Sequence, residues 1–92
     1  MERVAYFNGQ YLPESKVCVS FRDRGFILGD AVFDAERTFA GKIFRLEAHI
    51  DRLYQSLEKA RIEPGLSAAE MTEITHETVQ RNLALLGPAE DY

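Results

Sequence analysis

Three polar residues at helical spacing, His49, Arg52 and Ser56, are the first candidates for chemistry in the sequence. Side chains at positions i, i+3 and i+7 share one face of a helix, so these three would form a polar stripe. The planar guanidinium of Arg52 suits a phosphate group, because two parallel charge-assisted hydrogen bonds fix its position and orientation. The same residue also fits a surface arginine that pairs with Glu47, Asp51 or another neighbour. The periodicity alone leaves both interpretations open.

The two histidines and the single cysteine carry weaker signals. His49 fits either a structural residue that braces a sheet or a catalytic or metal-binding residue, and the sequence offers no second ligand at metal-binding spacing. We therefore predict no metal site. The surroundings of His76 are typical of a solvated helix face. Cys18 could form a thiolate pair with His49, but a buried and unreactive cysteine is the expectation.

Three acidic residues, Asp30, Asp34 and Glu36, share one face of an alternating pattern between positions 30 and 39. Two of them could form the paired carboxylates of a hydrolase. The same alternation is typical of a strand whose polar face meets solvent, and this is the interpretation that we adopt. We expect residues 30–39 to form the longest strand. Its other face would carry Ala31, Phe33, Ala35 and Phe39.

Turn signals predict the other strands. Asn8-Gly9 favours the positive φ angles of a type I′ turn, so we expect a hairpin over residues 4–12. Residues 17–21 alternate with a period of two, which predicts a further strand. Ala40-Gly41 predicts a tight turn into residues 42–44 and thus a second hairpin. The sheet is expected to be mainly antiparallel.

Helical periodicity follows the second hairpin. Apolar residues at spacings of three and four predict a helix from Leu46 to about Ile62. Ser67 and Glu70 have the spacing of a capping box, so a second helix starts there and runs toward the stop signal Gly87-Pro88. Residues 22–29 predict a loop that holds at most one helical turn. The predicted fold class is α+β: a small antiparallel sheet built from hairpins, followed by two packed helices.

The composition limits the classes of protein that fit the sequence. Its 92 residues, 46% hydrophobic and 28% charged, provide one core, so we expect a single domain over residues 1–92. A net charge of −4 argues against partners such as nucleic acid or an anionic membrane. One cysteine, no signal-peptide pattern and no apolar run of about 20 residues favour a cytoplasmic protein. Small molecules or proteins are the expected partners.

Several short motifs occur in a fixed order along the chain. They are Phe7-Asn8-Gly9, Asp23-Arg24-Gly25-Phe26, Gly29-Asp30, Val32-Phe33-Asp34, Gly41-Lys42-Ile43-Phe44-Arg45-Leu46 and His49-Ile50-Asp51-Arg52-Leu53. In this order and spacing they resemble the N-terminal small domain of class IV pyridoxal-phosphate-dependent aminotransferases, and they cover nearly the whole chain. That family includes branched-chain and D-amino-acid aminotransferases, R-selective amine transaminases and aminodeoxychorismate lyases. The resemblance implies the N-terminal part of a longer enzyme.

The resemblance also implies roles for particular residues. Arg52 matches the arginine that binds the phosphate of the cofactor, and we expect its guanidinium at the rim of a concave face with free donors. Phe33 matches a position that lines the substrate pocket, with Ala35 near the same wall and Arg37 further along the same face. Leu28 matches a pocket loop position that is often aromatic, and this departure argues against branched-chain specificity.

By resemblance, the enzyme transfers an amino group between an amino acid or amine and a 2-oxo acid through pyridoxal phosphate. Relatives hold this cofactor on a lysine of their C-terminal domain, and none of Lys16, Lys42 and Lys59 matches that position. We therefore assign no catalytic residue and expect the chain to be inactive alone. An aminodeoxychorismate lyase-like fragment and a non-enzymatic dimerisation or interaction module are the alternatives.

The resemblance further implies a homodimer, because the small domain of this family packs on a larger domain and on a second subunit. Such packing needs apolar surface. We therefore expect apolar side chains around Phe26, Ile27, Leu28 and Phe33 that are exposed in the single chain or buried by self-association.

Overall fold

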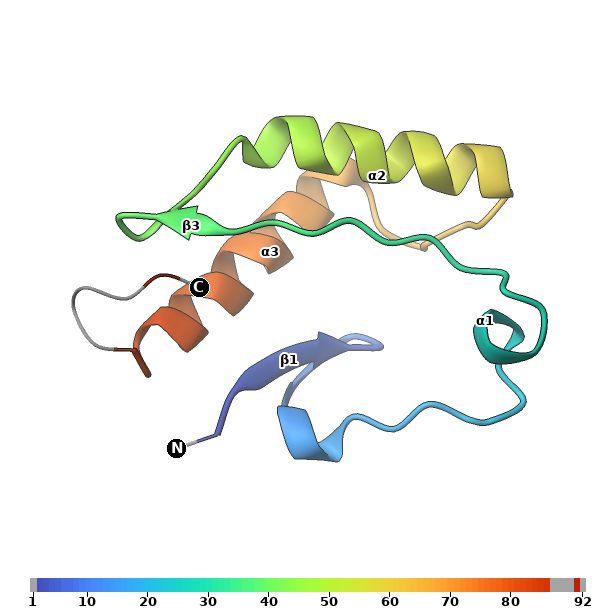
Figure 1. Cartoon of the computed structure of the whole chain (residues 1–92), viewed down its shortest axis with the longest axis horizontal. Coiled ribbons are helices and arrows are strands. Elements are labelled where there is room, and N and C mark those ends of the chain that lie inside the picture. The colour runs from blue at the N-terminus through green and yellow to red at the C-terminus, as the bar shows by residue number, and fades with distance from the viewer. Residues whose placement is uncertain (1, 87–90, 92) are drawn as a thin grey trace.

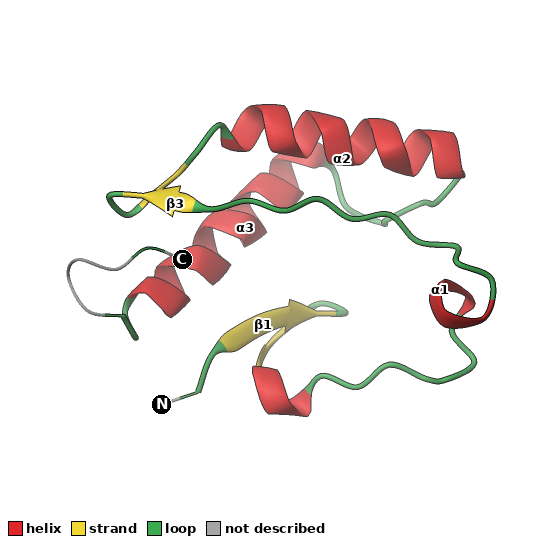
Figure 2. Cartoon of the chain, viewed as in Figure 1, coloured by secondary structure: helices red, strands yellow, loops and turns green. Residues whose placement is uncertain are grey.

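The computed structural model describes residues 2–86 and 91, and its fold is α+β, as predicted (Figures 1 and 2). In chain order the elements are β1 (Val4–Phe7), β2 (Gln10–Pro13), the 3-10 helix η1 (Glu14–Lys16), α1 (Arg24–Ile27), β3 (Thr38–Phe39), β4 (Lys42–Ile43), α2 (Leu46–Ala60) and α3 (Ala68–Leu83). The strands form two separate hairpins. Every described helix is too short or too polar for a bilayer-spanning segment.

The first hairpin confirms the prediction for residues 4–12. Strands β1 and β2 pair antiparallel along their whole length, with Tyr6 opposite Tyr11. The two turn residues, Asn8 and Gly9, have φ angles of 46° and 87°. Positive φ at both central positions matches the twist of the flanking strands, which is why Asn-Gly is favoured there. The rings of Tyr6 and Tyr11 pack edge to face, with their centroids 5.1 Å apart.

The second hairpin is shorter and is held from the far end of the chain. Strands β3 and β4 pair with Thr38 opposite Ile43, and the turn residues Ala40 and Gly41 again have positive φ angles. The carboxylate of Asp91 accepts hydrogen bonds from Thr38 Oγ1 at 2.9 Å and from the Gly41 amide at 3.0 Å. These bonds, the one from Gly41 first, lower the pKa of Asp91. The turn and Asp91 are therefore tied together.

Asn82 on α3 fastens that helix to the first hairpin. Its side chain is 1% exposed. Its Nδ2 donates to the carbonyl oxygen of Val4 at 2.8 Å, and its Oδ1 accepts from the amide of Val4 at 3.0 Å. The same Nδ2 donates to the carbonyl oxygen of Thr78 at 2.8 Å. The amide thus pairs with β1 as a strand backbone would, and sequence periodicity gave no sign of it.

The buried apolar centre lies along α2. Helix α2 begins after Arg45, which adopts left-handed backbone angles with φ 53°. The helix ends at Ala60, close to the predicted Ile62. Its apolar stripe contributes the buried hydrophobic residues of the described chain, Leu46, Ile50 and Leu57. The first predicted helix and its buried face are therefore confirmed.

Helix α3 starts at the predicted capping box. Ser67 Oγ accepts from the Glu70 amide at 3.1 Å, and a carboxylate oxygen of Glu70 accepts from the Ser67 amide at 2.9 Å. Each side chain satisfies a backbone donor that the first turn of a helix leaves free. The helix ends at Leu83, and the predicted stop signal Gly87-Pro88 lies outside the described residues. Helices α2 and α3 pack against each other, as predicted.

Two of the predicted strands are wrong. The expected long strand over residues 30–39 is a strand only at Thr38–Phe39, and the expected strand at residues 17–21 has no strand structure. Residues 30–37 instead run as an extended segment beside α2 (Figure 1). Within the described chain, no backbone hydrogen bond involves residues 32–36. Alternation determines which way side chains point, but a strand also needs a neighbour to pair with.

The alternation along the extended segment is real, but it points the opposite way from the prediction. The acidic side chain of Asp34 faces α2 and is 6% exposed, whereas Phe33 is 88% exposed. Ala35 and Arg37 are exposed as well, and Glu36 is half-buried. The expectation that the polar face meets solvent is therefore wrong at Asp34, because basic partners for its carboxylate lie on α2.

The prediction of exposed apolar surface is confirmed. Phe26 and Ile27 in α1 and Leu28 at its end are 71%, 61% and 67% exposed. Phe33 on the extended segment is exposed to a greater extent still. The predicted single helical turn corresponds to α1, whose start is capped by the side chain of Asp23. The single chain therefore leaves apolar side chains of α1 and of the extended segment in contact with water.

Candidate functional site

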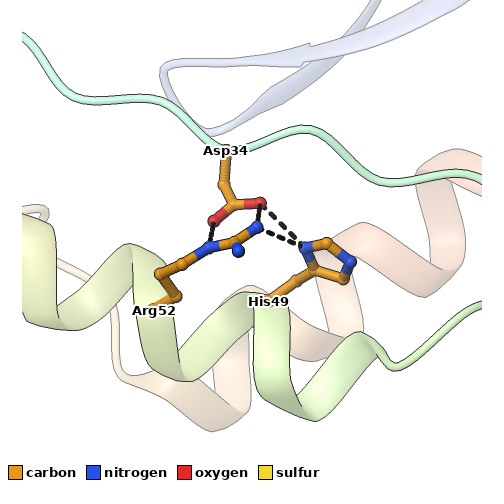
Figure 3. A network of polar contacts seen from close by, with 3 residues as sticks. All are labelled: Asp34, His49 and Arg52. Atoms are coloured by element: carbon orange, nitrogen blue, oxygen red, sulfur yellow. Dashed lines mark hydrogen bonds and ion pairs between the residues drawn. The ribbon is translucent and has the colours of Figure 1, made fainter.

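Asp34, His49 and Arg52 form one polar network between the extended segment and α2 (Figure 3). Asp34 Oδ2 accepts a hydrogen bond from Arg52 Nε at 2.7 Å, and Asp34 Oδ1 accepts one from Arg52 Nη2 at 2.8 Å. Oδ1 also lies 2.8 Å from Nδ1 of His49. Residues three apart on a helix share a face, so a single carboxylate reaches both basic side chains.

Burial and charge differ strongly across this network. The side chain of Asp34 is 6% exposed, whereas that of Arg52 is 63% exposed. Hydrogen bonds from Arg52, and next from His49, hold the pKa of Asp34 well below its usual range, although burial acts in the opposite direction. The hydrogen bond with Asp34 raises the pKa of Arg52. At neutral pH the network therefore contains an ionised carboxylate and a charged guanidinium.

The arrangement does not support a hydrolase pair of carboxylates. Asp30 pairs with Arg24 at 3.1 Å, and both oxygens of Asp34 are bound by side chains of α2. Among the described residues, Glu36 makes no hydrogen bond with Asp30 or Asp34. Burial raises the pKa of Glu36. Catalytic carboxylates of a hydrolase act on a shared substrate, whereas Asp34 holds an arginine.

A shallow pocket of about 290 Å³ lies on the outer side of this network. It is lined by Arg45, Ala48, His49 and Arg52. The guanidinium groups of Arg45 and Arg52 are hydrogen-bond donors and permanent cations. The lining therefore suits an anionic group with several acceptor oxygens, such as a phosphate.

Arg52 borders this pocket, but its donors are only partly free. Asp34 binds its Nε and Nη2 atoms, so the expectation of a guanidinium with free donors is wrong for these two atoms. Nη1 makes no hydrogen bond within the described residues. The ion pair predicted as the alternative has therefore formed, with Asp34 in place of Glu47 or Asp51. A phosphate can reach Arg52 through the remaining donors.

The four residues predicted to line a substrate pocket are all exposed. Phe33, Ala35 and Arg37 lie on the same outward face of the extended segment. The guanidinium of Arg37 stacks over the ring of Phe39, 4.4 Å from its centroid. Leu28 is the residue that ends α1, so it belongs to a different element. The structure thus places three of the four on one surface.

The remaining candidates are simple to place. Lys16, Lys42 and Lys59 are exposed, as expected. His76 is exposed on α3, which confirms the solvated-face prediction. Cys18 is a free cysteine and is exposed, so the expectation of a buried cysteine is wrong. Its segment is not a strand, and neither of the two sheets among the described residues includes it.

Sequence reasoning missed the role of Asp34 as the partner of Arg52. The two residues are 18 positions apart, so no helical or strand spacing rule connects them. It also missed Arg45, which the left-handed start of α2 places at the pocket. The alternation around Asp34 was the available signal, but it did not reveal which face is covered.

Comparisons with known proteins agree with the motifs. A family model described as amino-transferase class IV matches residues 31–85. A protein of Methanocaldococcus jannaschii, provisionally named a branched-chain-amino-acid aminotransferase, is 39% identical over 77 residues, which are 84% of this chain and 27% of that protein. The D-alanine aminotransferase of Staphylococcus aureus strain N315 is 29% identical over 82 residues, 89% of this chain and 29% of that enzyme. The chain spans less than a third of these relatives.

Proposed function

The chain belongs to the class IV aminotransferase family, and from this we propose that it is the N-terminal part of a pyridoxal-phosphate-dependent enzyme. The enzyme would transfer an amino group between an amino acid or amine and a 2-oxo acid. The observation that carries the proposal is the family match over residues 31–85. The names of the relatives, a branched-chain-amino-acid and a D-alanine aminotransferase, support the same reaction class.

The residues around Arg52 fit the phosphate of this cofactor. Their pocket offers donors from Arg45 and Arg52 on one side of α2, and His49 also lines it. When bound, pyridoxal phosphate supplies the electron sink for the reaction, while the protein binds and orients it. We assign the phosphate contact to Arg52. The bidentate pair with Asp34 limits this contact to the outer donors of the guanidinium.

The outward face of the extended segment is proposed as a wall of the substrate pocket. Phe33 supplies the largest apolar surface, and Ala35 and Arg37 follow it on the same face. Leu28 would contribute from the end of α1. A face that carries an exposed phenylalanine and, further along, a cationic arginine suits a substrate that combines an apolar side chain with a carboxylate.

The chain by itself is proposed to be inactive. Attachment of the cofactor needs a deprotonated amine held beside its aldehyde. The lysines of the chain, Lys16, Lys42 and Lys59, are exposed and lie on three different elements, η1, β4 and α2. The enzyme is further proposed to be cytoplasmic and to form a homodimer. The exposed apolar side chains support the homodimer.

Cofactor binding tests the proposal. The 92-residue chain is expected to give a weak, non-saturating imine absorbance with pyridoxal phosphate. Extending it with the C-terminal region of a relative should produce saturable binding. In the extended protein, Arg52→Ala should weaken cofactor retention before it alters the choice of substrate.

Arg81→Ala is the matched control. Arg81 is also ion-paired, through Nε to Glu77 at 3.0 Å, and is 46% exposed, but it lies on α3. This control should retain the cofactor as the parent does. Saturable, borohydride-trappable attachment to one lysine of the unextended chain would contradict the proposal of inactivity. Equal retention in Arg52→Ala and Arg81→Ala would contradict the role of Arg52.

A further inference from the structure

We propose that Asp34 is a positioning residue, which holds the inner edge of the Arg52 guanidinium so that the outer edge is presented to an anion in the pocket on α2. The inner edge is the Nε and Nη2 side bound by Asp34, and the outer edge is the Nη1 side. The proposal rests on the assignment of Arg52 as a phosphate contact. It adds that Asp34 and the phosphate share the arginine instead of competing for it.

The geometry of the Arg52 guanidinium allows it to bind Asp34 and an anion at the same time. The guanidinium is planar and its donors are fixed in one plane, so occupation of one edge fixes the direction of the other. The Asp34 end of the pair is buried and the Arg52 side chain is mostly exposed. The fixed end therefore lies under the protein surface, whereas Arg52 lines the pocket and its Nη1 makes no hydrogen bond within the described residues.

Displacement of Asp34 by an anion is unfavourable for the same reason. A phosphate that took the inner edge would leave the Asp34 carboxylate buried with His49 as its remaining partner. Removing one partner from a buried charge is strongly destabilising. An anion that uses the outer edge avoids this cost. Arg45 lies at the same pocket and supplies a second cation.

Asp34 also fixes the tautomer of His49. An ionised carboxylate only accepts hydrogen bonds, so the Nδ1 atom that lies 2.8 Å from Asp34 Oδ1 must carry a proton. Nδ1 cannot then accept from Arg52 Nη2, although the two atoms are 3.1 Å apart. Both groups instead donate to the same oxygen. One carboxylate thus orders two side chains that line the pocket.

A competing Asp34 and a positioning Asp34 predict opposite effects of Asp34→Asn on the affinity for phosphate. If Asp34 competes with the anion, its removal frees the arginine and makes the pocket more positive, so phosphate binds more tightly. If Asp34 positions the arginine, phosphate binding weakens, because a flexible guanidinium must be ordered by the ligand. Ordering one long side chain corresponds to a loss of roughly three- to tenfold in affinity.

The experiment is a titration of the 92-residue chain with inorganic phosphate, followed by nitrogen-15 NMR of the arginine and histidine side chains. In the wild type, the Nε proton of Arg52 should be protected from exchange before phosphate is added. It should keep its chemical shift at saturation while the Nη1 signals move. His49 should be protonated at Nδ1.

Asp34→Asn should lose the protection of the Arg52 Nε proton, lose the single histidine tautomer and bind phosphate three- to tenfold more weakly. Glu77→Gln is the matched control, because it removes the carboxylate partner of Arg81 and should leave phosphate binding unchanged. The wild-type spectra carry the test by themselves if the Asp34 variant does not fold.

Each of the following outcomes would contradict one part of the proposal. Tighter phosphate binding by Asp34→Asn, or movement of the wild-type Nε signal on titration, would show that Asp34 is a competitor. An unprotected Nε proton in the phosphate-free wild type would refute positioning. A protected Nε proton with no response of any Arg52 signal to phosphate would refute the phosphate contact itself, and with it the proposed role of Arg52.

Discussion

Replacement of Asn82 by alanine should loosen the attachment of the first hairpin to α3. The side chain is buried and makes three hydrogen bonds, two with the backbone of Val4 and one with the carbonyl oxygen of Thr78. A typical intramolecular hydrogen bond contributes about 1 kcal/mol net to stability. The sum is about 3 kcal/mol, and water can reach the half-buried Val4 and recover part of it. We expect the free energy of unfolding to fall by about 2–3 kcal/mol.

Urea unfolding followed by circular dichroism measures this loss, and amide hydrogen exchange at Val4 locates it. Exchange at Val4 should accelerate in Asn82→Ala, because its amide donates to the lost Oδ1. Asn82→Asp keeps an acceptor at that position and should protect Val4 in part. Gln80→Ala changes an exposed residue of the same helix and should have little effect. If Asn82→Ala lost no more stability than Gln80→Ala, with Val4 exchange unchanged, the attachment described above would be refuted.

Two further predictions concern charge and association. The pKa of Asp34 is depressed in the folded chain, so its contribution to stability is complete above the ordinary aspartate pKa of about 3.9 and is lost as the pH falls through the lower folded value. The stability advantage of the wild type over Asp34→Asn in urea unfolding should therefore shrink as the pH is lowered below about 4, and a constant advantage would contradict it. Analytical ultracentrifugation should show more than monomer, and Phe33→Ser should weaken the association by roughly ten- to a hundredfold, since burial of one phenylalanine contributes about 1.5–3 kcal/mol. A monomer at every concentration would exclude this role for Phe33.

The sequence predicted those elements whose signals are local. Asn8 and Gly9 select their turn through their own φ preferences, and Ser67 and Glu70 cap α3 over a single turn. The apolar stripe of α2 likewise follows from its spacing. These features need no information about the rest of the molecule.

The features that the sequence did not predict depend on partners that lie far away along the chain. The segment around Asp34 alternates as a strand does, but no strand among the described residues pairs with it. The basic side chains that bind its carboxylate lie on α2. The pairing of Asn82 with Val4 joins residues 78 positions apart. The motifs located Arg52 in the chain, but not the carboxylate that holds it.

The unpaired backbone of residues 32–36 is expected to affect the solubility of the protein. Both of its edges lack backbone hydrogen bonds within the described chain, and its outward side chains include the exposed Phe33. Such an edge is a template on which another chain can add a strand, and it is a site where aggregation starts. The charges of Glu36 and Arg37 interrupt the apolar sequence, as gatekeeper residues do. Solubility should therefore depend on these two side chains more than on the buried residues of α2.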